Sequence, residues 1–128
     1  MNRRALVIAG LALPFVPGSA KASANVQVVY VGGKDCPYCT LWRKKYEADW
    51  RASPEYKEVN WVEIEPPRLS EAYRESYWPG ELKDILDQVP RRNGTPRFLI
   101  VKNGKVVFNG LGVDQWRRAM LALKNVLE

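Results

Sequence analysis

The two cysteines of this chain are the feature that most constrains its fold, because they lie three positions apart in the motif Cys36-Pro37-Tyr38-Cys39. A β-rich apolar run, Val26 to Val31, precedes the motif, a pair of glycines follows that run, and aromatic residues at helical spacing come after the motif. Proline is favoured at the first position of a helix, where its missing N–H would have no intrahelical partner. We therefore predict a strand, a tight turn and a helix that begins at Pro37, with Cys36 at its N-cap.

This N-cap position predicts the chemistry of Cys36. The free N–H groups and the positive end of the helix dipole would stabilise a thiolate, lowering the pKa of the thiol and making it a better nucleophile and leaving group. Cys39 falls in one helical stripe with Trp42, Tyr46 and Trp50, so we expect it to point toward the core while Cys36 lies at the exposed tip. Cys36 is the candidate catalytic thiol that attacks, and Cys39 the one that resolves.

Three other interpretations of the cysteine pair can be weighed from the sequence. A structural disulfide across two residues would constrain the unfolded chain very little, because the stabilisation grows with loop length. A structural zinc site needs about four ligands, and the chain has no histidine and no third cysteine. Two thiolates could still hold Cu(I), which accepts low coordination by soft sulfur, so a copper carrier remains an alternative.

Residues 1–24 have the pattern of an export signal. The pair Arg3-Arg4 precedes a short apolar run, and small residues follow, with candidate cleavage sites after Ala22 and Ala24. The apolar run is too short to span a bilayer as a resident helix, and the paired arginines are similar to those of a twin-arginine signal. We expect a periplasmic protein without a membrane anchor after signal removal, with residues 25–128 as its single domain.

Size and charge narrow the possible partners. The mature chain would have about 104 residues, enough for one core, and we expect a monomer. The export segment holds three basic and no acidic residues, so its removal lowers the formal charge from +6 to +3. Basic residues alternate with acidic ones, as on a solvated helix face, which does not favour nucleic acid as a partner. In an oxidising compartment the two cysteines would rest as a disulfide or be kept reduced by a dedicated donor.

The rest of the chain predicts a small α/β domain. Val26 to Val31 is apolar on both faces, as in a central strand. The dipeptide Asn103-Gly104 between two β-rich runs predicts a hairpin, and Tyr77 and Trp78 fit either a small satellite core or a lip beside the cysteines. The other expected elements are a helix over 37–50, a strand within 58–65, a segment of rough helical spacing over 68–78, and helices over 81–89 and 113–127.

This succession, β-α-β-α-β-β-α, resembles the thioredoxin-like superfamily over most of residues 26–127. Three features carry the resemblance. The Cys36-Pro37-Tyr38-Cys39 motif has the spacing and intervening pair of glutaredoxins, Thr95-Pro96 falls where the family places a cis-proline, and Phe98 to Val107 is similar to the thioredoxin hairpin. The resemblance implies an α/β thioredoxin-like fold with a central mixed sheet of about four strands flanked by helices.

The resemblance also implies roles for individual residues. Pro96 would be cis and pack near Cys36, and the backbone of Thr95 would pair with an extended substrate peptide during the mixed-disulfide step. Pro37 and Tyr38 would tune the redox potential to a value between strong reductants and strong oxidants. No metal, nucleotide or flavin cofactor is required.

The sequence departs from the thioredoxin pattern at three places. Lys34 and Asp35 precede the first cysteine, where thioredoxins have a tryptophan. Tyr30 replaces the buried acid that thioredoxins carry, which puts in doubt a carboxylate base for deprotonating Cys39. The segment 66–89 is longer than its usual counterpart, and we expect partner specificity to reside there.

These inferences predict a periplasmic thiol–disulfide oxidoreductase that acts through Cys36 and Cys39. Its partners would be cysteine-containing periplasmic proteins and a membrane-linked electron donor or acceptor. Two alternatives from other classes are a Cu(I) carrier that uses the same thiolates and a non-catalytic binding module built on the thioredoxin fold.

Overall fold

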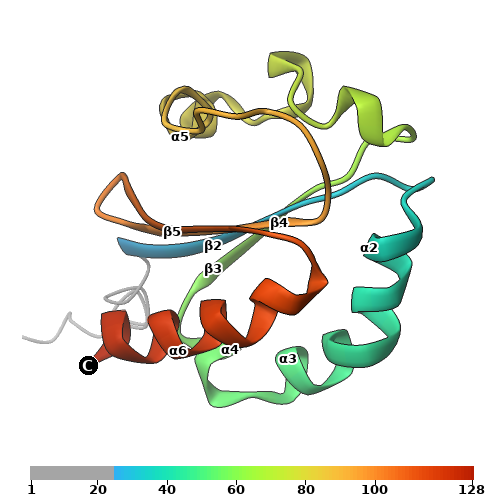
Figure 1. Ribbon diagram of the computed structural model, residues 1–128. Coiled ribbons are helices and arrows are strands. Elements are labelled where there is room, and N and C mark those ends of the chain that lie inside the picture. The colour runs from blue at the N-terminus through green and yellow to red at the C-terminus, as the bar shows by residue number, and fades with distance from the viewer. Residues whose placement is uncertain (1–24) are drawn as a thin grey trace, which may run out of the picture.

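A four-stranded mixed sheet forms the centre of the computed structural model, which describes residues 25–128. The predicted export segment lies outside the described residues. β2 pairs in parallel with β3 and antiparallel with β4, which pairs antiparallel with β5, giving the order β3-β2-β4-β5 (Figure 1). This confirms the predicted mixed sheet. The strands are β2 (Val26–Val31), β3 (Asn60–Ile64), β4 (Arg97–Lys102) and β5 (Lys105–Leu111).

The hairpin between β4 and β5 turns at the predicted dipeptide. Asn103 and Gly104 both have positive φ, 52° and 80°. A two-residue turn of this kind matches the twist of the flanking strands, and glycine adopts its second position without steric cost. The Asn-Gly pair therefore sets the register of the hairpin.

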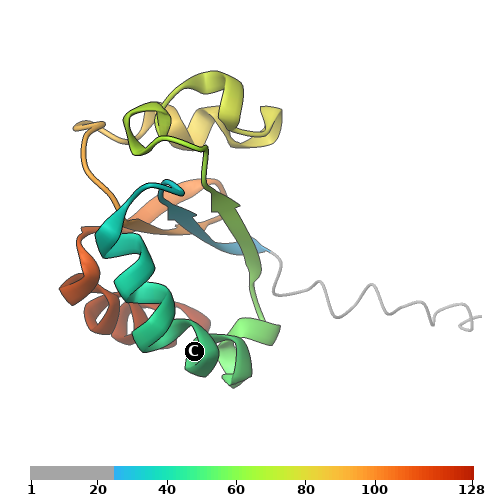
Figure 2. The same ribbon diagram turned by 90° about the vertical axis from the view of Figure 1, so that its right-hand side faces the viewer.

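Helices cover one face of the sheet, which we call the helical face (Figures 1 and 2). The expected helix over 37–50 is a continuous helical run that ends at Ala52 and whose middle, Arg43–Glu47, is π-helical. The last helix begins with a 3-10 turn, Val113–Gln115. The α-helices of this face are α2 (Pro37–Trp42), α3 (Ala48–Ala52), α4 (Pro54–Lys57) and α6 (Trp116–Leu127).

Large aromatic rings fill the core under the helical face. The Trp42 ring, on α2, stacks on Tyr30 of β2 at 5.0 Å between ring centroids and meets the edge of Trp116 of α6 at 5.1 Å. Trp50 and Phe98 pack in the same buried cluster, together with both cysteines. The cysteine-bearing helix is therefore held on the sheet by ring packing.

The opposite face of the sheet, which we call the turn face, is covered by residues 66–89 (Figure 2). The segment expected to have rough helical spacing forms two 3-10 turns, Leu69–Glu71 and Glu75–Tyr77. The helix expected over 81–89 is a 3-10 turn, Gly80–Leu82, followed by the short α5 (Lys83–Asp87).

Trp78 and Tyr77 have different environments on the turn face. Trp78 is 3 % exposed and belongs to an aliphatic cluster, whereas Tyr77 is 40 % exposed. The satellite-core interpretation is therefore confirmed for Trp78 alone. β2 contributes to both cores, as predicted for a central strand, since Val28 packs under the helical face and Val29 under the turn face.

Within residues 25–128, no helix combines the length and the apolar character needed to cross a membrane.

Candidate functional site

Cys36 and Cys39 form a disulfide at the start of α2, with their Cα atoms 5.2 Å apart. Pro37 is the first residue of the helix and Cys36 is its N-cap, as the sequence predicts. The backbone N–H of Cys39 donates a hydrogen bond to Cys36 Sγ over 3.1 Å, as a capping side chain accepts from the first turn of a helix. The helix terminus thus directs a backbone donor at the Cys36 sulfur.

Both cysteines are nearly buried, and the expectation that Cys36 lies at an exposed tip is wrong. Cys36 is 2 % exposed and Cys39 is 1 % exposed, whereas Tyr38 between them is 65 % exposed. A residue at the N-cap of an isolated helix would face solvent. Here Cys36 packs in the aromatic core cluster, and the hydroxyl of Thr95, on a separate loop, contacts its sulfur. Of the predicted tuning pair, Pro37 begins the helix and Tyr38 presents its ring to solvent.

Thr95 and Pro96 lie at the cysteine pair, although 59 positions separate Thr95 from Cys36. Thr95 Oγ1 donates to Cys36 Sγ over 3.1 Å. The Thr95–Pro96 peptide bond is cis, and the carbonyl of Pro96 accepts a hydrogen bond from the backbone N–H of Gly112 over 2.8 Å. The structure therefore brings together the two cysteines and both predicted substrate-binding residues.

Tyr30 of β2 is fully buried and stacks on Trp42 of α2. Its hydroxyl donates to Glu65 Oε2 over 3.3 Å, and the guanidinium of Arg43 lies 5.0 Å above its ring. Burial raises the pKa of Tyr30 far above its ordinary value, outweighing the opposing charge of Arg43, so the phenol stays protonated. A carboxylate is thus present beside Tyr30, but it belongs to Glu65, the residue that follows β3, and no sequence motif identifies it.

Glu65 belongs to a charged network that fastens the cysteine-bearing helix to β3. Arg43 bonds to Glu47 at 2.8 Å, to Glu63 at 2.8 Å and to Glu65 at 3.0 Å. Arg51 bonds to Glu47 at 3.0 Å and to Glu63 at 2.7 Å. The alternation of charges along the helix predicts a solvated face, whereas these two arginines reach across to Glu63 of β3.

Residues 33–35, which form the turn just before Cys36, are held in place by residues of the turn face. The backbone N–H of Lys34 donates to the carbonyl of Pro66 over 2.9 Å, and the Asp35 carboxylate accepts from the backbone N–H of Leu69 over 2.7 Å. A Cβ atom on Gly33 would lie 2.5 Å from Leu69 Cα, so only glycine permits this approach of the two backbones. Residues 66–69 therefore fix the position of the chain segment that leads into Cys36.

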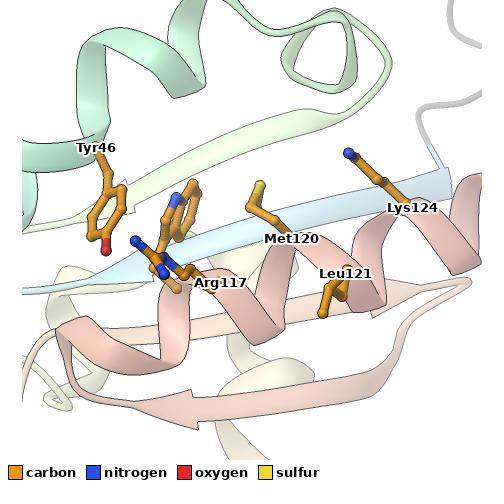
Figure 3. Close-up of a pocket in the computed structure, with 6 residues that line it drawn as sticks. Tyr46, Arg117, Met120, Leu121 and Lys124 are labelled. Carbon is orange, nitrogen blue, oxygen red and sulfur yellow. The ribbon is translucent and has the colours of Figure 1, made fainter.

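An apolar hollow beside the helices does not belong to this site. It has a volume of about 350 Å³ and lies between the helical run and α6, lined by Tyr46, Trp116, Arg117, Met120, Leu121 and Lys124. Figure 3 shows Tyr46 projecting from the helical run and the other labelled side chains from α6. None of the cysteines, Thr95 or Pro96 lines it. In the described part of the chain, no group of three or more His, Cys, Asp or Glu side chains is placed to hold a metal ion.

Solved thioredoxin structures share this architecture. A thioredoxin of Malassezia sympodialis matches with a TM-score of 0.53 and 15 % identity, over 84 % of this chain and 80 % of its own. Spinach chloroplast thioredoxin f matches with a TM-score of 0.51 and 20 % identity, over 89 % and 87 % of the two chains. Thioredoxin f2 of Chlamydomonas reinhardtii matches with a TM-score of 0.51 and 19 % identity, over 87 % and 88 %.

These similarities define the class of structure. The chain has the thioredoxin-like fold, with a Cys-x-x-Cys pair at disulfide distance at the start of its first long helical run. No family model matches the sequence, and no curated protein matches it either.

Proposed function

We propose that the protein is an exported thiol–disulfide oxidoreductase that exchanges disulfides with cysteine-containing proteins of the periplasm. The observation that carries this proposal is the disulfide at the N-cap of α2, whose Cys36 sulfur accepts hydrogen bonds from the Cys39 N–H and the Thr95 hydroxyl. In the reduced protein the same two donors would stabilise a Cys36 thiolate, which is the reactive form in thiol–disulfide exchange.

The exchange proceeds in two balanced steps. The Cys36 thiolate attacks one sulfur of a partner disulfide, a mixed disulfide forms, and the other partner sulfur leaves as a thiolate. The Cys39 thiolate then attacks Cys36 Sγ, which closes the internal disulfide and releases the second partner sulfur. Two electrons pass to the partner, and a membrane-linked donor restores the dithiol. The same steps in reverse oxidise a partner.

Thr95 and Pro96 support a peptide partner in this proposal. The Thr95 hydroxyl contacts Cys36 Sγ and the cis bond to Pro96 follows it directly. An extended segment paired with the backbone there would be bound largely without regard to its side chains. Tyr38, which is 65 % exposed, offers an aromatic contact next to the attacked sulfur. The periplasmic location rests on the export pattern of residues 1–24.

The burial of both sulfurs favours a second candidate, a non-catalytic binding module whose disulfide is inert. Exchange requires in-line access to a sulfur, and Cys36 is only 2 % exposed in the closed disulfide. The oxidoreductase proposal therefore requires that Cys36 Sγ become accessible to the partner's sulfur when the partner docks.

Reduction of insulin by dithiothreitol, followed as turbidity with catalytic amounts of the purified protein, tests the proposal. We expect acceleration by the parent protein, none by Cys36→Ser, and a covalent mixed disulfide with protein partners in Cys39→Ser, because its resolving thiol is missing. A parent protein that behaves like Cys36→Ser, together with an empty Cys39→Ser trap, would favour the inert module.

A further inference from the structure

Arg97, the residue after Pro96, is the only charged residue that is buried in the described part of the chain, at 5 % exposure. Its guanidinium donates four hydrogen bonds, all to uncharged acceptors. They run from Nε to the Tyr73 hydroxyl (2.7 Å), from Nη1 to Asn109 Oδ1 (2.6 Å), and from Nη2 to the carbonyls of Arg91 (2.6 Å) and Asn93 (3.2 Å).

No carboxylate compensates this buried cation. None of the ion pairs within residues 25–128 includes Arg97. Removing a charge from water without a counterion is costly, and the cost is offset only where hydrogen bonds satisfy the group. The planar guanidinium directs its N–H donors in several fixed directions, so this one side chain reaches acceptors on three separate segments.

The acceptors of Arg97 fix the loop that leads into Thr95. Two of them are carbonyls of that loop, at Arg91 and Asn93. A third carbonyl, at Gly94, accepts a hydrogen bond from the Tyr73 hydroxyl over 2.7 Å. Burial raises the pKa of Tyr73 despite the neighbouring Arg97, so its hydroxyl keeps the proton that it donates. Arg97 and Tyr73 thus hold the carbonyls of residues 91, 93 and 94, the last of which directly precedes the residue that touches Cys36.

We propose that Arg97, acting with Tyr73, is a positioning residue of the redox site: it holds the loop 91–94 so that Thr95 presents its hydroxyl to the Cys36 sulfur. The inference rests on the proposed function and names the residues that set the reactivity of Cys36. It also assigns a role to residues 66–89, which supply Tyr73. Neither Arg97 nor Tyr73 touches a sulfur, so both act through Thr95.

The test measures the pKa of Cys36 from the pH dependence of its alkylation by iodoacetamide, in a Cys39→Ser background where it is the one thiol. We expect Thr95→Val and Arg97→Met each to raise this pKa by about one unit, because a hydrogen bond to a charged group is lost. Tyr73→Phe should produce a smaller rise. Arg97→Lys keeps the charge but cannot span the acceptors, so its pKa should resemble that of Arg97→Met.

Arg92→Met is the matched control. Arg92 lies in the same loop but donates to the carbonyls of Leu86 and Val89, away from residues 93–95. The pKa of Cys36 should keep its parental value in this variant. Thermal unfolding of each variant verifies folding, and Tyr73→Phe decides the question if Arg97→Met does not fold.

The proposal is overturned if a folded Arg97→Met or Tyr73→Phe variant retains the parental pKa of Cys36. Restoration of the parental value by Arg97→Lys would also overturn it, since charge alone would then account for the effect. Either result leaves the oxidoreductase proposal intact. That proposal fails separately if the parental Cys36 has the ordinary thiol pKa of about 8.5 and the protein shows no exchange.

Discussion

The two faces of the sheet differ in how they are built and in what they contribute to the site. The helical face has long helices and a core of stacked rings, and it carries both cysteines. The turn face has an aliphatic core under short turns and carries no cysteine. Yet the turn face contacts the site twice, at the turn before Cys36 through Leu69 and at the Thr95 loop through Tyr73. The helical face supplies the reactive atoms, and the turn face positions their surroundings.

Gly33→Ala should break the connection between the two faces and lower the stability of the protein. The new Cβ would lie 2.5 Å from Leu69 Cα and 2.6 Å from Leu69 N, both backbone atoms that cannot move without shifting the turn. We expect a loss of about 1–3 kcal/mol, the usual cost of overpacking, measured by urea unfolding. The control is Gly80→Ala, whose Cβ meets nothing within 4 Å. Equal losses of stability in Gly33→Ala and Gly80→Ala would show that the close approach of the Gly33 and Leu69 backbones does not constrain the fold.

The same substitution on each face sharpens the comparison. Trp78 Nε1 donates to the carbonyl of Ala72 over 2.8 Å on the turn face, whereas the buried Nε1 of Trp42 has no partner among the described residues. Trp78→Phe leaves a buried carbonyl unpaired, but Trp42→Phe removes an unpaired donor. We expect Trp78→Phe to lower the free energy of unfolding by about 1–3 kcal/mol more than Trp42→Phe. A larger loss for Trp42→Phe would contradict the hydrogen-bond argument.

The charged network on the helical face predicts a smaller, pH-dependent effect. Burial alone would raise the pKa of Glu63, but hydrogen bonds from Arg43 and Trp61 outweigh it and hold the pKa below its ordinary range. A carboxyl whose pKa is lower in the folded state stabilises the protein above its unfolded pKa of about 4.3, and this contribution is lost as pH falls through the folded value. Glu63→Gln should therefore flatten the acid limb of the stability profile, measured by unfolding at successive pH values. An unchanged acid limb would contradict the assignment.

The elements with strong periodicity could be predicted from the sequence. β2, the hairpin at Asn103-Gly104 and α6 lie where the pattern placed them, because each is long enough for its apolar spacing to be recognised. The 3-10 turns of residues 69–82 are shorter than one period of such a pattern, so their form depends on the core that they cover. The π-helical stretch likewise has no signal in the sequence.

The features of the candidate site also divide into those that the sequence predicts and those that it does not. The N-cap position of Cys36 and the proximity of Thr95 could be predicted, the first from Pro37 and the second from the resemblance to thioredoxins. The burial of Cys36 could not, since it depends on what packs over the helix start. Arg97 resembles any polar residue that begins a strand, and its role emerges only from the three segments that meet around its guanidinium.

The central claim is that the buried Cys36–Cys39 disulfide is redox-active in the folded protein. The most direct measurement incubates the native protein in a series of glutathione redox buffers and counts free thiols by alkylation and mass spectrometry, while circular dichroism follows the fold. The account predicts a reversible two-electron transition between disulfide and dithiol with the fold intact. A disulfide that stays closed in every buffer until the protein is unfolded would contradict it.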